Sequence, residues 1–355
     1  MMSSTRLKKL QENIEKNQAF FITKESDIYY YTEFNFLVPE EKESYLIVTQ
    51  DSVYLIYASF CPVTKSQDII YLTDIYPEKL RFNLRHIIEK ENIKKVFIDK
   101  SHTSVTEFEI LGSLDLSINP IPAQIIEQQR MIKDSSEINL IKEACKISKK
   151  SFEIVRNKLK EGMTEIEVEE LLEETMSEQG SQKPAFPTII AFGENGALPH
   201  HQPTKKKLDK NTAILIDFGA TYQNYRSDMT RSFWFGDDPT DEFRKIEEIV
   251  KKAYSLALDV SRNTNVTASQ IDLSAREYIK YQGYSDQFIH TTGHGLGLEI
   301  HEKPSLNWKN DEKLLNKTVF TIEPGIYLKG KFGFRYENTI LLDKDTKEKV
   351  LELTL

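Results

Sequence analysis

The sequence predicts a small α/β domain followed by a larger α+β domain that consists of two similar halves. Helix-like and strand-like stretches alternate up to about residue 120. The segment Asn119-Pro120-Ile121-Pro122 then interrupts the pattern and is the best candidate for a linker. After it, a pair of helices followed by strands occurs twice. A chain of 355 residues suits two domains, which we place at residues 1–125 and 126–355.

The N-terminal part is predicted to be a mixed α/β domain that contains no candidate catalytic or metal-binding motif. Apolar residues at helical spacing predict helices over residues 6–16 and 79–91. Short runs of strand-forming residues predict strands, which lie at residues 19–23, 44–48, 53–57 and 95–99. The region has no Gly-rich phosphate loop and no cluster of His or acidic residues. We therefore expect a structural, substrate-covering or dimer-forming role.

Helix-start signals recur in the C-terminal part about a hundred residues apart. An acid or threonine followed three residues later by Glu or Gln is typical of a capping box. Such pairs are Asp134 with Glu137, Thr164 with Glu167, and Thr267 with Gln270, and a further helix is predicted over residues 243–262. Strand-rich sequence follows each helix pair, at residues 188–192 and 213–235 and again at 318–327 and 334–342. This weak duplication predicts two α–β halves that face each other with a site between them.

Composition excludes several classes of function. A formal net charge of −8 argues against a nucleic-acid-binding surface. The two cysteines, Cys61 and Cys145, are far apart, which fits a reducing compartment and argues against a disulfide framework or a zinc–cysteine site. The charged N-terminus has no apolar signal core, and no apolar run is long enough to span a bilayer. We expect a cytoplasmic protein that does not bind membranes.

Two acids, eleven positions apart, lie at the ends of neighbouring extended runs. Asp217 ends the apolar run 213–216, and Asp228 lies near the start of the run 227–235. A buried carboxylate is unfavourable unless donors or a cation meet it, and a shared metal ion is the simplest partner for two. On this pair alone, two acids that are solvated or that cap turns explain the pattern equally well.

Four further stretches add to this pair. His294 lies between Gly293 and Gly295, where missing side chains let the backbone approach its neighbours closely, and His301 follows seven residues later. A glycine run of this kind can also form a phosphate-binding loop, but the spacing here differs from that of a dinucleotide-binding loop. Glu323 ends an alternating strand before Pro-Gly. Glu337 follows Arg335 by two residues, so strand alternation would place both on one face.

Each of these residues has an ordinary explanation, since a lone histidine is usually structural and an acid at a strand end is usually solvated. Together, two Asp, two Glu and one His form an oxygen-rich set with a single nitrogen. Such a set suits a pair of divalent ions held by bridging carboxylates, and it is a poor match to structural zinc.

The order of these motifs resembles that of the pita-bread metallopeptidases. The residues that carry the resemblance are Asp217 and Asp228, Gly293-His294-Gly295, Gly297-Leu298-Glu299-Ile300-His301-Glu302-Lys303-Pro304, Thr321-Ile322-Glu323-Pro324-Gly325 and Arg335-Tyr336-Glu337. The proline-specific branch, prolidase (Xaa-Pro dipeptidase) and Xaa-Pro aminopeptidase, is the most similar. Ala197-Leu198-Pro199-His200 and Arg130 to Lys133 with Glu137 also match that branch. The match covers the whole chain, with a creatinase-like N-terminal domain before the pita-bread domain.

The resemblance implies a role for each matching residue. The metal ligands would be Asp217, Asp228, His294, Glu323 and Glu337, with Asp217 on one ion, Asp228 and Glu337 bridging, and His294 and Glu323 on the other. His200, His301 and Glu323 would be catalytic, and His290 and Arg335 would shape the substrate pocket. The implied cofactor is two divalent ions, Mn²⁺ with Co²⁺ or Zn²⁺ as alternatives. The implied substrates are proline-containing peptides, and the implied assembly is a homodimer.

The chemistry follows from general principles. Two adjacent ions lower the pKa of a shared water and supply hydroxide near neutral pH. Glu323 would take the proton of that water and pass it to the leaving nitrogen. His301 and His200 would donate to the developing oxyanion. An Xaa-Pro bond calls for a dedicated site because proline lacks the N–H on which ordinary peptidases rely.

Two departures and three rivals remain. Asn338 stands where many relatives carry Asp, and Ser305 stands where some prolidases place an arginine for the dipeptide carboxylate, which favours longer peptides. The rivals are a methionine aminopeptidase-like enzyme, a metal-free creatinase-type hydrolase and a non-catalytic pseudo-peptidase that binds partners. The N-terminal extension and Pro199-His200 argue against the first, and the intact ligand set argues against the other two.

Overall fold

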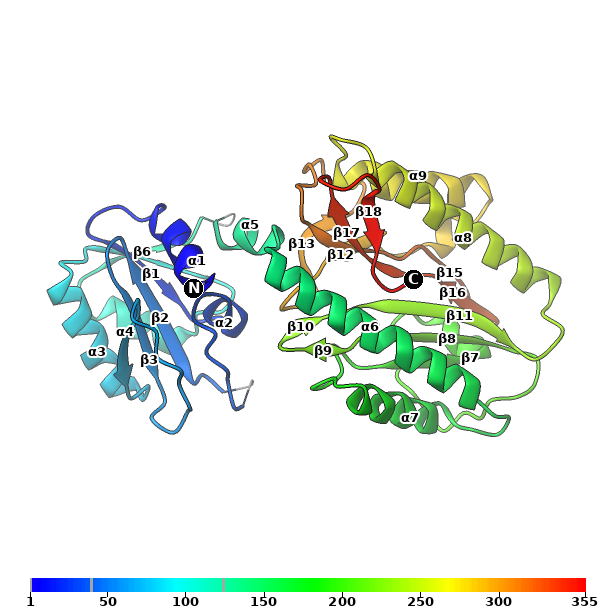
Figure 1. Ribbon diagram of the computed structural model, residues 1–355, viewed down its shortest axis with the longest axis horizontal. Coiled ribbons are helices and arrows are strands. Elements are labelled where there is room, and N and C mark those ends of the chain that lie inside the picture. The colour runs from blue at the N-terminus through cyan, green and yellow to red at the C-terminus, as the bar shows by residue number, and fades with distance from the viewer. Residues whose placement is uncertain (1, 39–40, 123–124) are drawn as a thin grey trace. The chain divides into compact units, whose positions relative to one another are not determined.

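A computed structural model describes residues 2–38, 41–122 and 125–355 (Figure 1). The chain forms two compact units, Met1–Arg130 and Met131–Leu355. The segment expected as a linker contributes Asn119 and Pro120 to an edge strand of the first unit, and residue 125 begins a short helix, α5 (Ile125–Met131). In the described part of the chain, no helix has the length and apolar composition needed to cross a bilayer.

The first unit is a six-stranded mixed sheet of order β4-β3-β2-β1-β5-β6 with helices packed on it. Its strands are β1 (Gln18–Ile22), β2 (Ser44–Thr49), β3 (Val53–Tyr57), β4 (Ile70–Thr73), β5 (Lys95–Ile98) and β6 (Ser117–Pro120), and its other helices are α1 (Met2–Gln11), α2 (Glu25–Thr32), α3 (Pro77–Lys90) and α4 (Val105–Gly112). Residues of α3 and α4, such as Leu84 and Ile110, share a core with Phe21 and Ile47. The four predicted strands and the helix predicted over residues 79–91 are confirmed with small shifts at their ends. The helix predicted over residues 6–16 lies at Met2–Gln11 instead, and β4, β6, α2 and α4 were not predicted.

The second unit repeats one topology twice, which confirms the predicted duplication (Figure 1). The first half has helices α6 (Ser135–Lys158) and α7 (Glu165–Glu178) and the antiparallel strands β7 (Ile189–Phe192), β8 (Thr212–Phe218) and β11 (Met229–Phe235). The second half has α8 (Asp241–Ser261) and α9 (Ala268–Tyr281) and the antiparallel strands β12 (Gly293–Gly295), β14 (Val319–Ile322) and β17 (Asn338–Asp343). The outer strands β13 (Glu302–Leu306) and β18 (Lys349–Glu352) extend the second sheet to five.

Each half also carries a small hairpin between its second and third strand. The hairpin of β9 (Thr221–Tyr222) and β10 (Tyr225–Arg226) interrupts the predicted run 213–235. The hairpin of β15 (Gly325–Leu328) and β16 (Phe332–Arg335) lies between β14 and β17. Consequently, the expectation that Arg335 and Glu337 share a face of one strand is wrong. The strand ends at Arg335, because Tyr336 N donates to Pro324 O and Glu337 N to Thr230 O, outside either ladder.

The predicted capping boxes start three of the four long helices. Asp134, Thr164 and Thr267 each accept a hydrogen bond from the backbone N–H three residues on, and the residue there bonds back. After α7 and α9, Gly180 and Gly283 adopt φ of +104° and +88°, a conformation that favours glycine. Local sequence therefore sets both ends of these helices.

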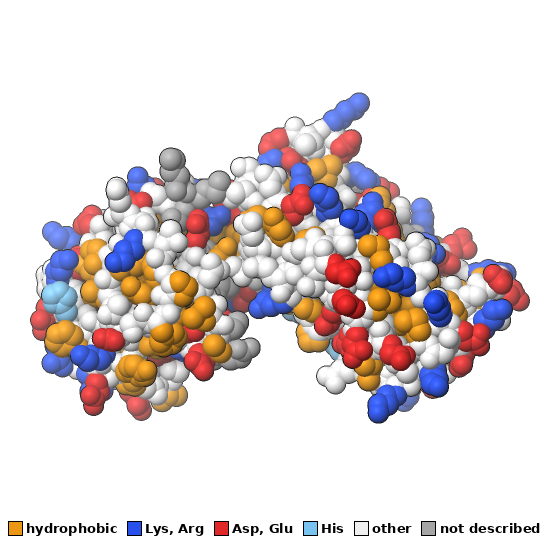
Figure 2. Space-filling model, turned by 60° about the horizontal axis from the view of Figure 1, so that its bottom comes forward, with side chains coloured by type: hydrophobic (Ala, Val, Ile, Leu, Met, Phe, Trp, Pro, Cys, Tyr) orange, Lys and Arg blue, Asp and Glu red, His pale blue; other side chains and the backbone are white. Residues whose placement is uncertain are grey.

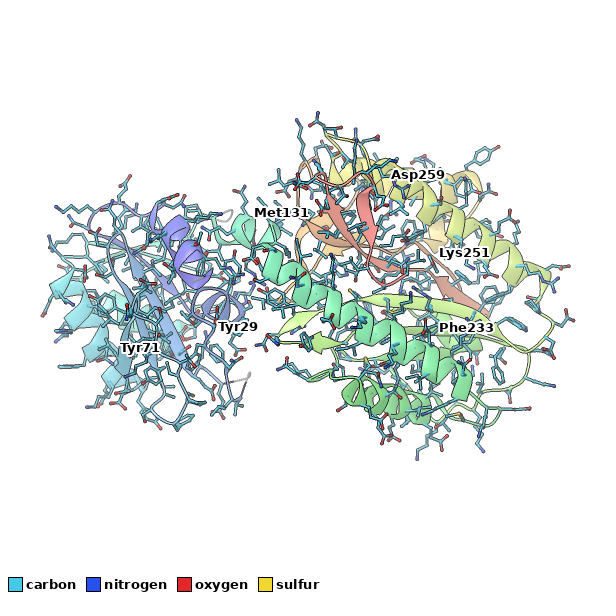
Figure 3. All side chains as sticks on the ribbon, in the orientation of Figure 1. Tyr29, Tyr71, Met131, Phe233, Lys251 and Asp259 are labelled. Carbon is cyan, nitrogen blue, oxygen red and sulfur yellow. The ribbon has the colours of Figure 1, made fainter. Side chains whose placement is uncertain are left out.

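Helix α8 shows why the helices pack against the strands. Its residues Ile246, Val250, Ala253 and Ala257 recur every three or four positions and are buried in the core of the second half. The exposed residues Lys251 and Asp259 lie eight positions apart on the opposite side (Figure 3). On the face drawn in Figure 2, acidic and basic side chains are interspersed, and the sequence carries a net charge of −8.

A buried polar network around Asn338 joins β11, β17, β18 and α8. Asn338 Oδ1 accepts from Arg231 Nη2 (2.8 Å) and Thr354 Oγ1 (3.0 Å). Its Nδ2 donates to Tyr254 OH (2.9 Å) and to Glu352 Oε2 (3.3 Å), and Tyr254 in turn donates to Glu352. Asn338 therefore serves as donor and acceptor at once, which an aspartate cannot do.

We predict that Asn338→Asp destabilises the protein by about 1–3 kcal/mol. The substitution removes the donor to Tyr254 and places a second carboxylate beside Glu352. Chemical denaturation followed by circular dichroism measures the change. The double variant with Glu352→Gln should recover most of the loss. A single variant as stable as the parent would show that the network does not require an amide.

Candidate metal centre

Four acids occupy equivalent places in the two halves of the second unit. Asp217 lies near the end of β8 and Asp228 just before β11, on either side of the β9–β10 hairpin. Glu323 follows β14 and Glu337 precedes β17, on either side of the β15–β16 hairpin. The repeated topology thus supplies one acid before and one after each hairpin.

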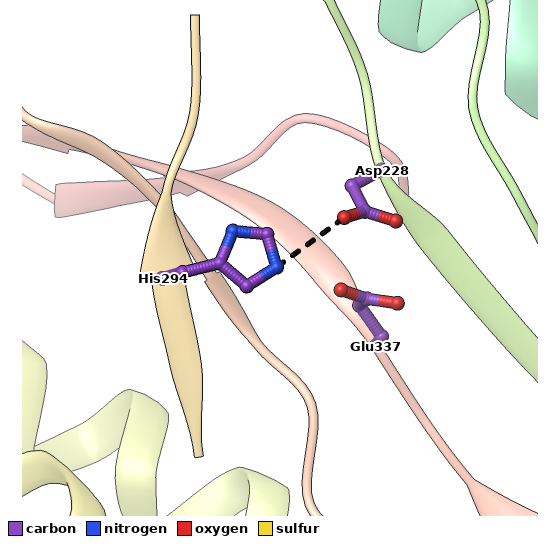
Figure 4. Close-up of side chains that lie close together, drawn as sticks. All are labelled: Asp228, His294 and Glu337. Atoms are coloured by element: carbon purple, nitrogen blue, oxygen red, sulfur yellow. Dashed lines mark ion pairs between the residues drawn. The ribbon is translucent and has the colours of Figure 1, made fainter. Parts of the chain in front are cut away.

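Three of the five predicted ligands meet directly. Asp228, His294 and Glu337 each offer a ligand atom, and these atoms lie within 4.8 Å of one another (Figure 4). His294 Nε2 is 3.5 Å from Asp228 Oδ2 and 3.3 Å from Glu323 Oε1, so Glu323 adjoins the same group. His294 is supplied by β12, the first strand of the second half.

Asp217 has one carboxylate oxygen with a hydrogen-bond donor and one without. Its Oδ2 accepts a hydrogen bond from Arg335 Nη2. Its Oδ1 is buried and has no hydrogen-bond partner among the described residues. A buried carboxylate oxygen without a donor is unfavourable, and a bound cation would satisfy it.

Neighbouring side chains hold the acids in place. Thr230 Oγ1 donates to Glu337 Oε2 at 2.6 Å and accepts from Arg335 Nε at 2.9 Å. Arg335 therefore braces Asp217 directly and Glu337 through Thr230. Arg335 is 3% exposed, so it adds a fixed positive charge beside a set of four acids. One arginine cannot neutralise four carboxylates.

The pKa values reflect this excess of negative charge. Burial, then the neighbouring Glu337 and Asp217 charges, raise the pKa of Asp228 well above its usual range. Burial and the charges of Glu323 and Asp217 do the same for Glu337. Glu323 behaves differently: although burial opposes its ionisation, the hydrogen bond and charge of His294 lower its pKa to about 2. Without a cation, the site therefore holds protons on some of its acids.

The backbone around His294 determines the orientation and the tautomer of its imidazole ring. A Cβ on Gly293 would lie 2.0 Å from Thr321 O, and one on Gly295 would lie 2.1 Å from Lys303 O, so both positions require glycine, as expected. His294 Nδ1 lies 3.1 Å from Gly295 O, and only a protonated nitrogen can bond to a carbonyl. When His294 is neutral, as metal ligation requires, its proton therefore lies on Nδ1 and the Nε2 lone pair faces the acids.

The donor set and its environment fit divalent cations. The residues that could hold them are Asp217, Asp228, His294, Glu323 and Glu337, which offer mainly oxygen atoms and one imidazole nitrogen. Deep burial, mutual repulsion and an unpartnered oxygen all disfavour this arrangement in the absence of positive charge.

Three further histidines lie around the acids. The rings of His301 and His294 are 4.4 Å apart between centroids. Burial, His294 and then His200 lower the pKa of His301, so His200 is close enough to influence it. His290 Nδ1 bonds to Thr291 O at 2.7 Å, and its Nε2 lies 2.8 Å from Tyr327 OH. The structure thus places His301 against His294 and links His290 to Tyr327.

Tyr327 is a site residue that the sequence analysis missed. Its hydroxyl accepts from Arg335 Nη1 at 2.6 Å, so its own proton is available for His290 Nε2. Burial raises the pKa of Tyr327 to about 12, and the hydroxyl stays protonated at neutral pH. The chain Asp217–Arg335–Tyr327–His290 therefore connects the acids to His290. No local signal distinguishes this tyrosine from the others in the sequence.

The pair Asp272 and Arg276 on α9 was also missed. Asp272 is fully buried and accepts from Thr292 N (3.0 Å) and Thr292 Oγ1 (2.8 Å). Arg276 forms a two-pronged ion pair with Asp272 and donates to His290 O at 2.7 Å. Together they hold the segment that carries His290. Their spacing of four residues on a helix was a usable signal, although it is also typical of a surface ion pair.

The chain matches the sequence models of two protein families. Residues 139–344 match the metallopeptidase family M24, and residues 6–132 match the creatinase/prolidase N-terminal domain. The fold and the buried acidic site define a pita-bread metallopeptidase, which is a hydrolase. The chain belongs to metallopeptidase family M24 and carries the creatinase/prolidase N-terminal domain.

Individual relatives bear Xaa-Pro names. The chain is 33% identical over 347 residues to a Xaa-Pro dipeptidase of Pyrococcus horikoshii, covering 97% of this chain and 96% of that protein. It is 41% identical over 221 residues to a Xaa-Pro dipeptidase of Pyrococcus furiosus, covering 62% of this chain and 63% of that protein. The crystal structure of an X-Pro aminopeptidase from Thermotoga maritima superposes with a TM-score of 0.86 at 34% identity, covering 99% of this chain and 97% of that one.

We predict that a divalent ion raises the melting temperature, and more so at pH 8 than at pH 5. Because the folded-state pKa values of Asp228 and Glu337 are raised, the metal-free protein loses stability as pH rises from their unfolded values through the raised ones. A cation binds the deprotonated acids and offsets that loss. At an ion concentration of 100 times Kd the gain is about 2.7 kcal/mol, or roughly 5–10 °C.

Differential scanning fluorimetry of chelated protein, with and without MnCl₂, measures this effect across the pH range. The variant Asp228→Asn serves as a control that should lose most of the increment. An increment of equal size at both pH values, or none at all, would show that these acids do not bind the ion.

Proposed function

We propose that this enzyme is a dinuclear-metal exopeptidase that hydrolyses the Xaa-Pro bond at peptide N-termini. The observation that carries the proposal is the cluster of four acids, from equivalent places in two halves, with His294. One oxygen of Asp217 is buried there and no described donor satisfies it. The Xaa-Pro names of relatives with matching length and fold point to the substrate class.

In this proposal the five ligands divide between two ions. Asp217 would hold one ion, Asp228 and Glu337 would be shared by both, and His294 with Glu323 would hold the second. The position of Asp228 and Glu337 beside each other supports their bridging role, and the contact between His294 and Glu323 supports their pairing. We propose Mn²⁺, with Co²⁺ or Zn²⁺ as alternatives, because the set mixes carboxylate oxygens with one imidazole.

The remaining chemistry belongs to the side chains. When bound, the ions polarise the scissile carbonyl and lower the pKa of a water molecule. Glu323 is ionised at neutral pH and can take up a proton, which it then delivers to the leaving proline nitrogen. His301 and His200 donate to the oxygen of the scissile carbonyl as it gains charge. His290 and Arg335 shape the pocket, with Tyr327 between them.

Ser305 supports action on peptides longer than two residues. It lies directly opposite His294 in the β12–β13 ladder, so the two side chains project from the same face of the sheet. An arginine at this place would extend over the site and could bind the terminal carboxylate of a dipeptide. Ser305 is short and uncharged, and its hydroxyl accepts from Asn307 Nδ2 at 3.0 Å.

We also propose a cellular compartment and an oligomeric state for the enzyme. Cys61 and Cys145 are both buried and unpaired, which supports a reducing, cytoplasmic compartment. We propose a homodimer on the basis of the family resemblance. The match of residues 6–132 to the creatinase/prolidase N-terminal domain favours the proline-specific branch over methionine aminopeptidase.

We predict that the purified enzyme, chelated and reloaded with Mn²⁺, hydrolyses Ala-Pro-Ala faster than Ala-Pro, and that Met-Ala-Ala is a poor substrate. Released amino acids are measured by chromatography. Glu323→Gln should remain folded and lower kcat by about 10²–10⁴-fold, because it removes the group that moves the proton.

The outcomes separate the alternatives. Preferred cleavage of Met-Ala-Ala would establish a methionine aminopeptidase, and preferred cleavage of Ala-Pro would establish a dipeptidase. Absence of turnover on all three peptides with any of the three metals would favour a protein that only binds partners. Near-normal turnover by Glu323→Gln would remove that residue from its role.

A further inference from the structure

Glu165 is a buried carboxylate outside the metal centre. It is the first residue of α7, a position usually open to solvent, yet its side chain is 0% exposed. Removing an ionised carboxylate from water is unfavourable unless hydrogen-bond donors replace the water. The surroundings of Glu165 supply such donors from one continuous segment of the chain.

Five hydrogen bonds converge on this carboxylate. Oε1 accepts from Phe192 N (2.8 Å) and Asn195 Nδ2 (2.9 Å). Oε2 accepts from His201 Nε2 (2.9 Å), Thr204 N (2.9 Å) and Thr204 Oγ1 (2.6 Å). Although burial opposes it, these bonds lower the pKa of Glu165, so the carboxylate stays ionised.

These bonds tie together both ends of the segment that carries His200. The segment starts at Phe192, the last residue of β7, passes through the 3₁₀ helix Gly193–Ala197 and ends near Thr204. Asn195 and His201 bracket His200 and both bond to Glu165. The 3₁₀ helix packs on β15 and β16, the hairpin that carries Tyr327 and Arg335. Glu165 therefore fixes the path of the chain on either side of His200.

The same bonds distinguish the two adjacent histidines. An ionised carboxylate can only accept, so His201 Nε2 must carry a proton and donate it to Glu165. His201 is 9% exposed and is committed to this contact. His200 is exposed, so it is the member of the pair that is not committed to Glu165.

We infer that Glu165 is a positioning residue of the active site, which sets the placement of His200 through the segment 192–204. The inference rests on the proposed function, in which His200 acts on the substrate. Glutamine replaces this carboxylate poorly, because its NH₂ group would face a backbone N–H in either orientation, that of Phe192 or that of Thr204. A displacement of about 1 Å at a catalytic group can cost about 100-fold in rate.

The test is a double-mutant cycle between Glu165→Gln and His200→Ala, with kcat on Ala-Pro-Ala as the readout. If Glu165 acts through His200, Glu165→Gln lowers kcat by about 10–100-fold in the parent but by less than about 3-fold in the His200→Ala background. Manganese content, measured by elemental analysis, should stay unchanged in every variant.

Glu167→Ala is the control on the same helix, because alanine removes the side chain that completes the capping box. Glu167 lies on the same turn of α7, is exposed, and bonds to Thr164 in the capping box. Its loss should lower the melting temperature while kcat stays within about 2-fold, since a cap stabilises the helix and not the segment 192–204. This control separates loss of stability from loss of placement.

Each other outcome counts against the inference in a distinct way. An equal loss in both backgrounds, or normal kcat in Glu165→Gln with impaired His200→Ala, would overturn the positioning role and leave the proposed function intact. Normal kcat in His200→Ala would instead remove His200 from the proposed function, and the inference with it. If Glu165→Gln does not fold, Asn195→Ala and Thr204→Val, which each remove one donor, replace it in the cycle with the same criteria.

Discussion

Repulsion among four clustered carboxylates, three of them buried and one partly buried, is the constraint on which the second unit depends. Asp217, Asp228, Glu323 and Glu337 lie together with one histidine and one balancing arginine, and burial together with this repulsion raises the pKa values of Asp228 and Glu337. Such a cluster disfavours the folded chain unless positive charge enters it. Divalent cations supply that charge, so in this account metal binding and the stability of the fold are linked.

The internal repeat explains how one chain brings these groups together. Each half presents one acid before its hairpin and one after it, and the halves face each other. The repeat also includes the residues that hold the histidine-bearing segments in place. A buried carboxylate on the second helix of each half, Glu165 on α7 and Asp272 on α9, holds a segment that carries a histidine with a proposed role, His200 or His290. Rigid helices thus position histidines that lie on loops.

Local signals in the sequence predicted much of the fold and located the acids. Capping boxes and helical spacing marked the long helices correctly, because these depend on nearby residues. The two-residue strands of the β9–β10 hairpin were too short to show a period, and the break after Arg335 depends on contacts with Pro324 and Thr230. Tyr327, Asp272 and Glu165 escaped notice because their roles arise from partners distant in sequence, which composition and spacing do not reveal.

We propose that five side chains hold two cations side by side. Anomalous diffraction from crystals grown with MnCl₂, collected on either side of the manganese edge, tests it most directly. We expect two anomalous peaks, both bridged by Asp228 and Glu337, with Asp217 on one side and His294 and Glu323 on the other, at carboxylate–metal distances of about 2.0–2.2 Å. A single peak, or peaks away from these residues, would contradict the dinuclear centre.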